Sequence, residues 1–146
     1  MVLGVVAGAG SLAGAEQRAV TSQWTGVFTA AQAYRGRDAY GQYCANCHGV
    51  NLAGLPQEVR YQGQSPFTPA LVGEQFAANW NGLSLGRLFE RIKTSMPQQN
   101  PGVLPRQTVA DIMAFMLEQA GYLPGGTDIS AGEHALDNVT FLKTRP

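Results

Sequence analysis

The residues best suited to chemistry lie together in the stretch GQYCANCHGV, residues 41–50. It contains both cysteines of the chain, Cys44 and Cys47, and one of its two histidines, His48. Two thiols with two residues between them and an imidazole directly after them suit three kinds of chemistry. These are structural zinc binding, thiol–disulfide chemistry and covalent attachment of haem.

The rest of the sequence weighs against the first two kinds. A structural zinc site normally has four ligands, but there is no third cysteine and the other histidine, His134, is distant. A redox dithiol normally begins a helix that follows a strand, whereas this motif follows a predicted helix. Haem attachment employs all three residues, because two thioether bonds fix the porphyrin over the adjacent imidazole. We therefore favour haem, with zinc and a dithiol or plain disulfide as the alternatives.

A six-coordinate haem needs a second axial ligand, and the candidates are His134 and the methionines. Met113 and Met116 fall on the apolar stripe of a predicted helix, so we expect them to pack in the core. Met96 lies at a helix end and is followed by a proline, so its thioether is free of helical constraint. We expect Met96 to be the ligand, with core packing as its alternative role, and His134 to be solvated.

Helical patterns dominate the chain, with no internal repeat and no sustained period-two alternation. Gly36 and Tyr40 share one face of the first predicted helix, and a glycine inside a helix indicates close approach of another backbone. After Pro124 the sequence predicts an irregular tail on the surface. The patterns predict helices from Thr29 to Tyr43, from Ser84 to the prolines at 97 and 101, and from Pro105 to Ala120, with a short turn at 72–78 and a loop at 49–68.

Caps and apolar stripes support these helices. Thr29 and Gln32 have the spacing of a capping box, in which each side chain satisfies a backbone N–H at the helix start, and Ser84 is a good N-cap. The last two helices each carry an apolar stripe that we expect to be buried; the stripes consist of Leu85, Leu88, Phe89 and Ile92, and of Val109, Ile112, Met113, Met116 and Leu117.

Length and charge indicate one soluble domain. Ten basic side chains balance ten acidic ones, which argues against nucleic-acid binding, and no run approaches the ~20 apolar residues of a membrane span. Residues 1–15 are uncharged and end in Ala-Gly-Ala, which predicts an export signal, although the first basic residue is Arg18. The alternatives are a true start that lies upstream and a plain apolar N-terminus. We expect a single domain over 16–146, with a core at 26–125 and a tail at 126–146.

Several motifs in chain order resemble the class I cytochrome c family over residues 26–125. They are CANCHG, PALVG, a tryptophan, TSMPQQNPG and VADIMAFML. The resemblance implies an all-α cytochrome c fold in which the N- and C-terminal helices cross around one covalently bound haem c. At that crossing Gly36 and Tyr40 would meet Ala114 and Phe115.

The resemblance also implies a set of haem-site residues. His48 would be the proximal and Met96 the distal iron ligand, and a cavity for the group is expected between them. Trp80, Tyr34, Arg87 and Arg91 are candidates to meet the haem propionates, with core packing or solvation as their alternatives. Arg87, Arg91 and Lys93 form an expected basic patch. The implied site residues are Cys44, Cys47, His48, Met96, Pro69 and Leu71.

The function implied is that of an exported, periplasmic one-electron carrier with redox proteins as partners: a dehydrogenase as donor, and an oxidase or another cytochrome as acceptor. The stretch WTGVFTAAQAYRG is similar to bacterial cytochromes that accompany quinoprotein (pyrroloquinoline quinone) dehydrogenases. The alternatives are a cytochrome subunit of such a dehydrogenase or of another respiratory complex, and a haem sensor or enzyme with an open sixth position.

Overall fold

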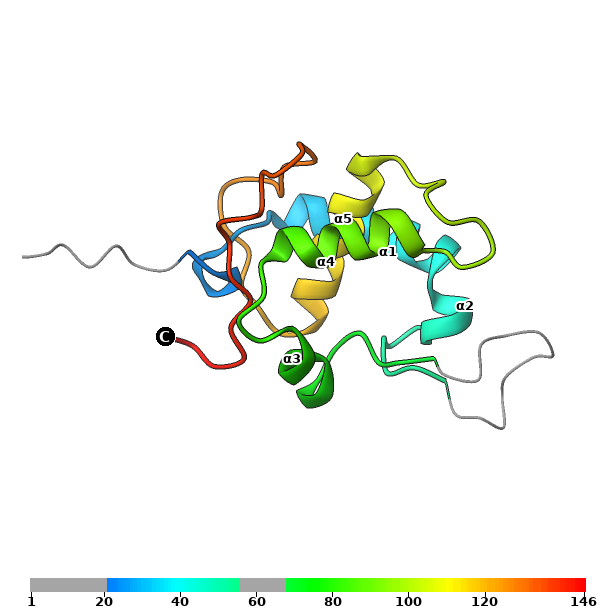
Figure 1. Ribbon diagram of the computed structural model, residues 1–146, viewed down its shortest axis with the longest axis horizontal. Coiled ribbons are helices and arrows are strands. Elements are labelled where there is room, and N and C mark those ends of the chain that lie inside the picture. The colour runs from blue at the N-terminus through cyan, green and yellow to red at the C-terminus, as the bar shows by residue number, and fades with distance from the viewer. Residues whose placement is uncertain (1–20, 56–67) are drawn as a thin grey trace, which may run out of the picture.

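The computed structural model describes residues 21–55 and 68–146 of the protein, and the predicted signal at 1–15 and most of the predicted loop lie outside these ranges. The described residues form helices and isolated bridges but no strand, so the all-α expectation is confirmed. The predicted turn at 72–78 is a helix displaced by two residues. In chain order the helices are η1 (Gln23–Thr25), α1 (Ala30–Tyr43), α2 (Ala45–His48), α3 (Glu74–Trp80), α4 (Leu85–Ser95) and α5 (Arg106–Gln119) (Figure 1).

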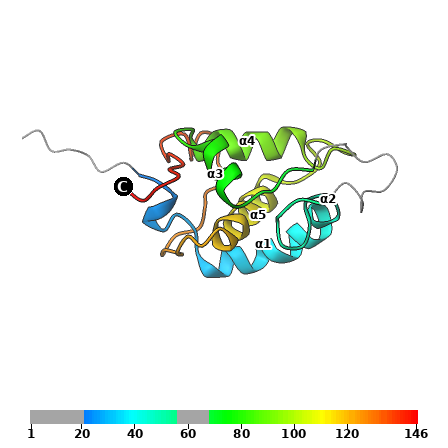
Figure 2. The ribbon, with the colours of Figure 1, turned by 90° about the horizontal axis from the view of Figure 1, so that it is seen from below.

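Helix α5 is the centre of the fold and lies between α1 and α4 (Figure 2). Its whole apolar stripe is buried, as the sequence predicts. Helix α1 crosses α5 at Gly36, where an added Cβ would overlap the carbonyl oxygen of Asp111. One turn further along, Tyr40 meets Phe115 with 5.3 Å between ring centroids. The sequence prediction of a close backbone approach at the glycine is therefore confirmed.

The first turn of α1 differs from the predicted capping box. The hydroxyl of Thr29 accepts from the backbone N–H of Gln32 at 3.1 Å, which is half of the box. The Gln32 side chain does not return to the cap. It donates to the carbonyl of Ile129 at 3.1 Å and accepts from the Ile129 N–H at 2.6 Å. A buried glutamine thus anchors the C-terminal tail to the first helix.

The tail is irregular, as predicted, but it does not merely lie on the surface. Ile129, Leu136 and Phe141 are buried in the common core. At its end the Gln23 side chain makes two hydrogen bonds to the backbone of Leu142, of 2.5 and 3.0 Å. The tail therefore runs beside the N-terminal segment at one end of the molecule (Figure 1), and the core extends past the predicted limit at residue 125.

Candidate haem site

His48 ends the single-turn helix α2 and is held from two sides. Its ring Nδ1 lies 2.8 Å from the carbonyl oxygen of Pro69. Because a carbonyl only accepts, Nδ1 carries the proton in this pairing, and the lone pair of Nε2 remains for a metal. The hydroxyl of Tyr40 donates to the carbonyl of Gly49 at 2.7 Å and fixes the backbone behind the ring. The imidazole is thereby buried and oriented by its neighbours.

The predicted attachment and ligand residues border one cavity of about 670 Å³. Cys44 and Cys47 come from the turn that carries His48, and Met96 comes from the C-terminal end of α4. This volume lies within the range of sites for drug-sized ligands and cofactors. The structure therefore brings the two cysteines, the histidine and the methionine to a common space, although Cys44 and Met96 are 52 positions apart in the sequence.

Some of the remaining predicted site residues line the cavity, and others do not. Pro69, Leu71, Trp80 and Arg91 line it. Three other candidates lie outside its lining: Tyr34 is 63% exposed beneath the guanidinium of Arg37, Arg87 points from an exposed position of α4, and Lys93 donates to the carbonyl of Gly102. The expected basic patch is therefore divided, and only Arg91 borders the cavity.

Several lining residues were not predicted as such. Phe76 and Asn79 come from α3, whose short sequence carries no clear periodicity, and Gln98 and Gln99 lie in the loop that follows Met96. The sequence offered no signal for these four. Others were predicted only as buried stripe residues, because an apolar stripe does not distinguish a cavity wall from packed core; they are Leu88, Ile92, Ile112 and Met116.

The donor set and its surroundings fit a haem better than the alternatives. Burial, with a smaller effect of Cys47, raises the pKa of the Cys44 thiol to about 11. The attacking cysteine of a dithiol oxidoreductase has a lowered pKa, which is the opposite shift. Among the residues that the structure describes, no three His, Cys, Asp or Glu side chains converge as a metal-binding group. A mostly apolar cavity with one imidazole, one thioether and two nearby thiols instead suits a porphyrin.

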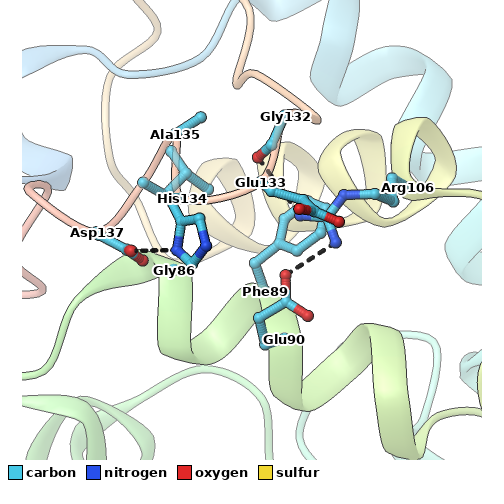
Figure 3. A pocket seen from close by; sticks show the side chains of 10 residues that line it. Gly86, Phe89, Glu90, Arg106, Gly132, Glu133, His134, Ala135 and Asp137 are labelled. Atoms are coloured by element: carbon cyan, nitrogen blue, oxygen red, sulfur yellow. Dashed lines mark hydrogen bonds and ion pairs between the residues drawn. The ribbon is translucent and has the colours of Figure 1, made fainter.

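His134 lies in a separate surface groove between the tail and α4 (Figure 3). Its side chain is 85% exposed, and Nδ1 is 2.8 Å from a carboxylate oxygen of Asp137. In the same groove Arg106 pairs with Glu90 at 2.9 Å and lies over the ring of Phe89. His134 does not border the cavity of His48 and Met96, and it is solvated as predicted.

Comparison with known proteins agrees with this site. The family model described as "Cytochrome C oxidase, cbb3-type, subunit III" matches residues 31–116, from the first turn of α1 to the last turn of α5. A search of curated proteins and a search of solved structures each gave no match. The match covers more than half of the chain, and the Cys44–Cys47 pair fits the attachment motif of the family. The chain therefore belongs to the class I c-type cytochromes and is an electron-transfer protein with covalently bound haem c.

Proposed function

We propose that this chain is a one-electron carrier whose haem iron is ligated by His48 and Met96. The observation that carries the proposal is the shared cavity, in whose lining the imidazole and the thioether both lie beside the two cysteines. Haem c supplies a reversible one-electron couple between Fe(III) and Fe(II) when it is bound. Pro69 and Leu71, also in the lining, would contact the porphyrin.

Each residue has a physical role in such a carrier. The hydrogen bond from Nδ1 of His48 to Pro69 fixes the ring and makes Nε2 a better donor. A thioether favours Fe(II), so Met96 would raise the reduction potential relative to a second imidazole. Apolar side chains in the cavity exclude water. If His48 and Met96 both bind the iron, no position would remain for a substrate, which would suit electron transfer rather than catalysis.

We place the mature carrier in the periplasm, with residues 1–15 as the signal and residues 16–146 as the domain. The support is the uncharged start with its Ala-Gly-Ala site, together with haem attachment, which in this family occurs on exported chains. Within residues 21–55 and 68–146, no helix has the length and hydropathy to cross a membrane. The donor we expect is a dehydrogenase, and the acceptor is an oxidase or another cytochrome.

A second candidate function is that of a cytochrome subunit in a larger enzyme, such as a quinoprotein dehydrogenase or another respiratory complex. The description of the matching family, a subunit of a cytochrome c oxidase, favours it. Size-exclusion chromatography of native extracts, followed at the haem absorption band, distinguishes the two. A carrier elutes at the size of one chain, whereas a subunit co-elutes with an oxidase or dehydrogenase activity.

Two methionines border the cavity, and they provide a matched test of ligation. We expect Met96→Leu to abolish the weak far-red absorption band that methionine gives to ferric haem and to lower the reduction potential. Met116→Leu, which changes the other cavity methionine, should retain the band. The measurement is the visible spectrum of each oxidised holoprotein, with a redox titration. A Met96→Leu protein with an unchanged band and potential contradicts this ligation and favours an open-site sensor or enzyme.

A further inference from the structure

Helix α3 forms part of the cavity wall and packs against the core only through partly buried side chains. It contributes Phe76, Asn79 and Trp80 to the lining. None of its seven residues is buried. In the described part of the chain, the extensive contacts between helices join α1, α2, α4 and α5, and none involves α3. Contacts outside these helix pairs therefore contribute to holding this wall in place.

The C-terminal segment 139–143, which we call the strap, binds the backbone next to α3. The N–H of Phe141 donates to the carbonyl of Leu83 at 2.8 Å, and its carbonyl accepts from the N–H of Gly82 at 2.8 Å. The carbonyl of Val139 accepts from the N–H of Leu85 at 2.7 Å. The strap thus fixes the turn that joins α3 to α4, and Leu83 of this turn also lines the cavity.

Side chains of the strap hold α3 itself. The ring of Phe141 is 98% buried and meets Phe76 edge-on, with centroids 6.1 Å apart and an angle of 85° between the rings. The ammonium of Lys143 pairs with Glu74 at the start of the helix. The N–H of Lys143 donates to the Asn81 side chain at its end, at 2.8 Å. Both ends and the inner face of α3 are therefore attached to the strap.

We infer that the strap controls the solvent exposure of the haem by positioning the α3 wall, and that Phe141 is a positioning residue that acts through Phe76. This inference rests on the haem occupying the cavity described above. Ferric haem carries one more positive charge than ferrous haem, so water near the iron stabilises Fe(III). A closed α3 wall excludes water from the haem and keeps its reduction potential high. A loosened wall admits water and lowers the reduction potential. The family match ends at residue 116, so the strap lies outside the matched region.

The test compares two buried side chains of the same tail. Phe141→Leu removes the ring that meets Phe76, whereas Ile129→Ala removes a side chain whose backbone is bound to α1 and which does not line the cavity. We expect both holoproteins to melt at lower temperature. Only Phe141→Leu should raise the ratio of oxidised to reduced protein at a fixed solution potential, by roughly threefold, and speed amide hydrogen exchange in α3 by about tenfold. Equal potentials and equal α3 exchange in the two variants overturn the inference.

A surface variant keeps the test decisive if Phe141→Leu does not fold. Asn81→Ala removes the exposed side chain that accepts from the N–H of Lys143, and it leaves the core intact. It should shift the potential and the α3 exchange in the same directions by smaller amounts, and wild-type values for both overturn the inference. The far-red band of the wild-type protein separates this outcome from failure of the proposed ligation, because the band reports Met96 and the α3 exchange reports the strap.

Discussion

At the scale of single residues, Arg91 stands out because it is a permanent cation in the described lining of the cavity. None of the ion pairs in the described parts of the chain involves it. A haem brings two propionates, and a guanidinium is the side chain that pairs best with a carboxylate. Arg87, one turn earlier on α4, is exposed and outside the lining. The two arginines therefore form a natural comparison.

We predict that Arg91→Gln lowers the reduction potential of the holoprotein, because loss of a nearby positive charge stabilises Fe(III) relative to Fe(II). The effect should weaken in high salt, since the site opens to solvent at this exposed residue. Redox titrations at low and high ionic strength measure both effects. Arg87→Gln is the control and should leave the potential unchanged; equal shifts in the two variants would refute a specific role for Arg91.

The sequence predicted which rare residues meet at the cavity better than it predicted the cavity walls. Three residues of the attachment motif and Met96 could be chosen because their types are rare in this chain and their positions are unusual. Arg87 and Arg91, in contrast, have the same type and lie four residues apart, on one face of a helix. Which of them borders the cavity depends on how α4 lies against α5, and that packing is not encoded in local spacing.

At the scale of elements, the fold depends on the crossing of α1 and α5. Gly36 permits the contact, because its Cα hydrogen faces the backbone of Asp111. The side chain of Asp111 then pairs with Arg35 of α1 at 3.2 Å, beside the contact. Gly41 belongs to the same helix but faces open space, with no atom within 4 Å of an added Cβ. The two glycines thus have the same helix propensity and different surroundings.

We predict opposite effects of alanine at these two glycines. Gly36→Ala forces the helices apart and should destabilise the holoprotein by about 2 kcal/mol or more. Gly41→Ala should stabilise it by about 0.5–1 kcal/mol, because alanine restricts the unfolded chain and favours the helix. Urea unfolding followed by far-ultraviolet circular dichroism gives both values. A Gly36→Ala protein as stable as the wild type would show that the crossing tolerates a wider separation.

Periodicity determined which elements could be predicted. The helices with clear signals were predicted to within about a residue at their starts. These signals are the apolar stripes of α4 and α5 and the caps at Thr29 and Ser84. Helix α3 has seven residues and no stripe, so its position was displaced. The Gln32 side chain was misassigned because a capping box and a long-range bond to Ile129 require the same residue type.

At the scale of the whole molecule, the two ends of the described chain close the fold together. Ser22 and Gln23 are buried against the last residues of the tail, and the indole N–H of Trp24 donates to the carbonyl of Leu142 at 2.9 Å. These contacts join residues more than 115 positions apart, so no local pattern predicts them. A tail rich in glycine and acidic residues is typical of a surface segment. Its scattered apolar residues, of which Ile129, Leu136 and Phe141 are buried, are the only local indication of burial.

Covalent binding of one haem through Cys44 and Cys47 is tested most directly by the intact mass of the denatured chain. The protein is expressed with export in a host that matures c-type cytochromes, and Cys44→Ser/Cys47→Ser is expressed in parallel. We predict that the wild-type chain retains the mass of one haem after denaturation, with a c-type pyridine haemochrome, and that the double variant retains none. A wild-type chain of unmodified mass from this host would contradict the account and return the motif to zinc or thiol chemistry.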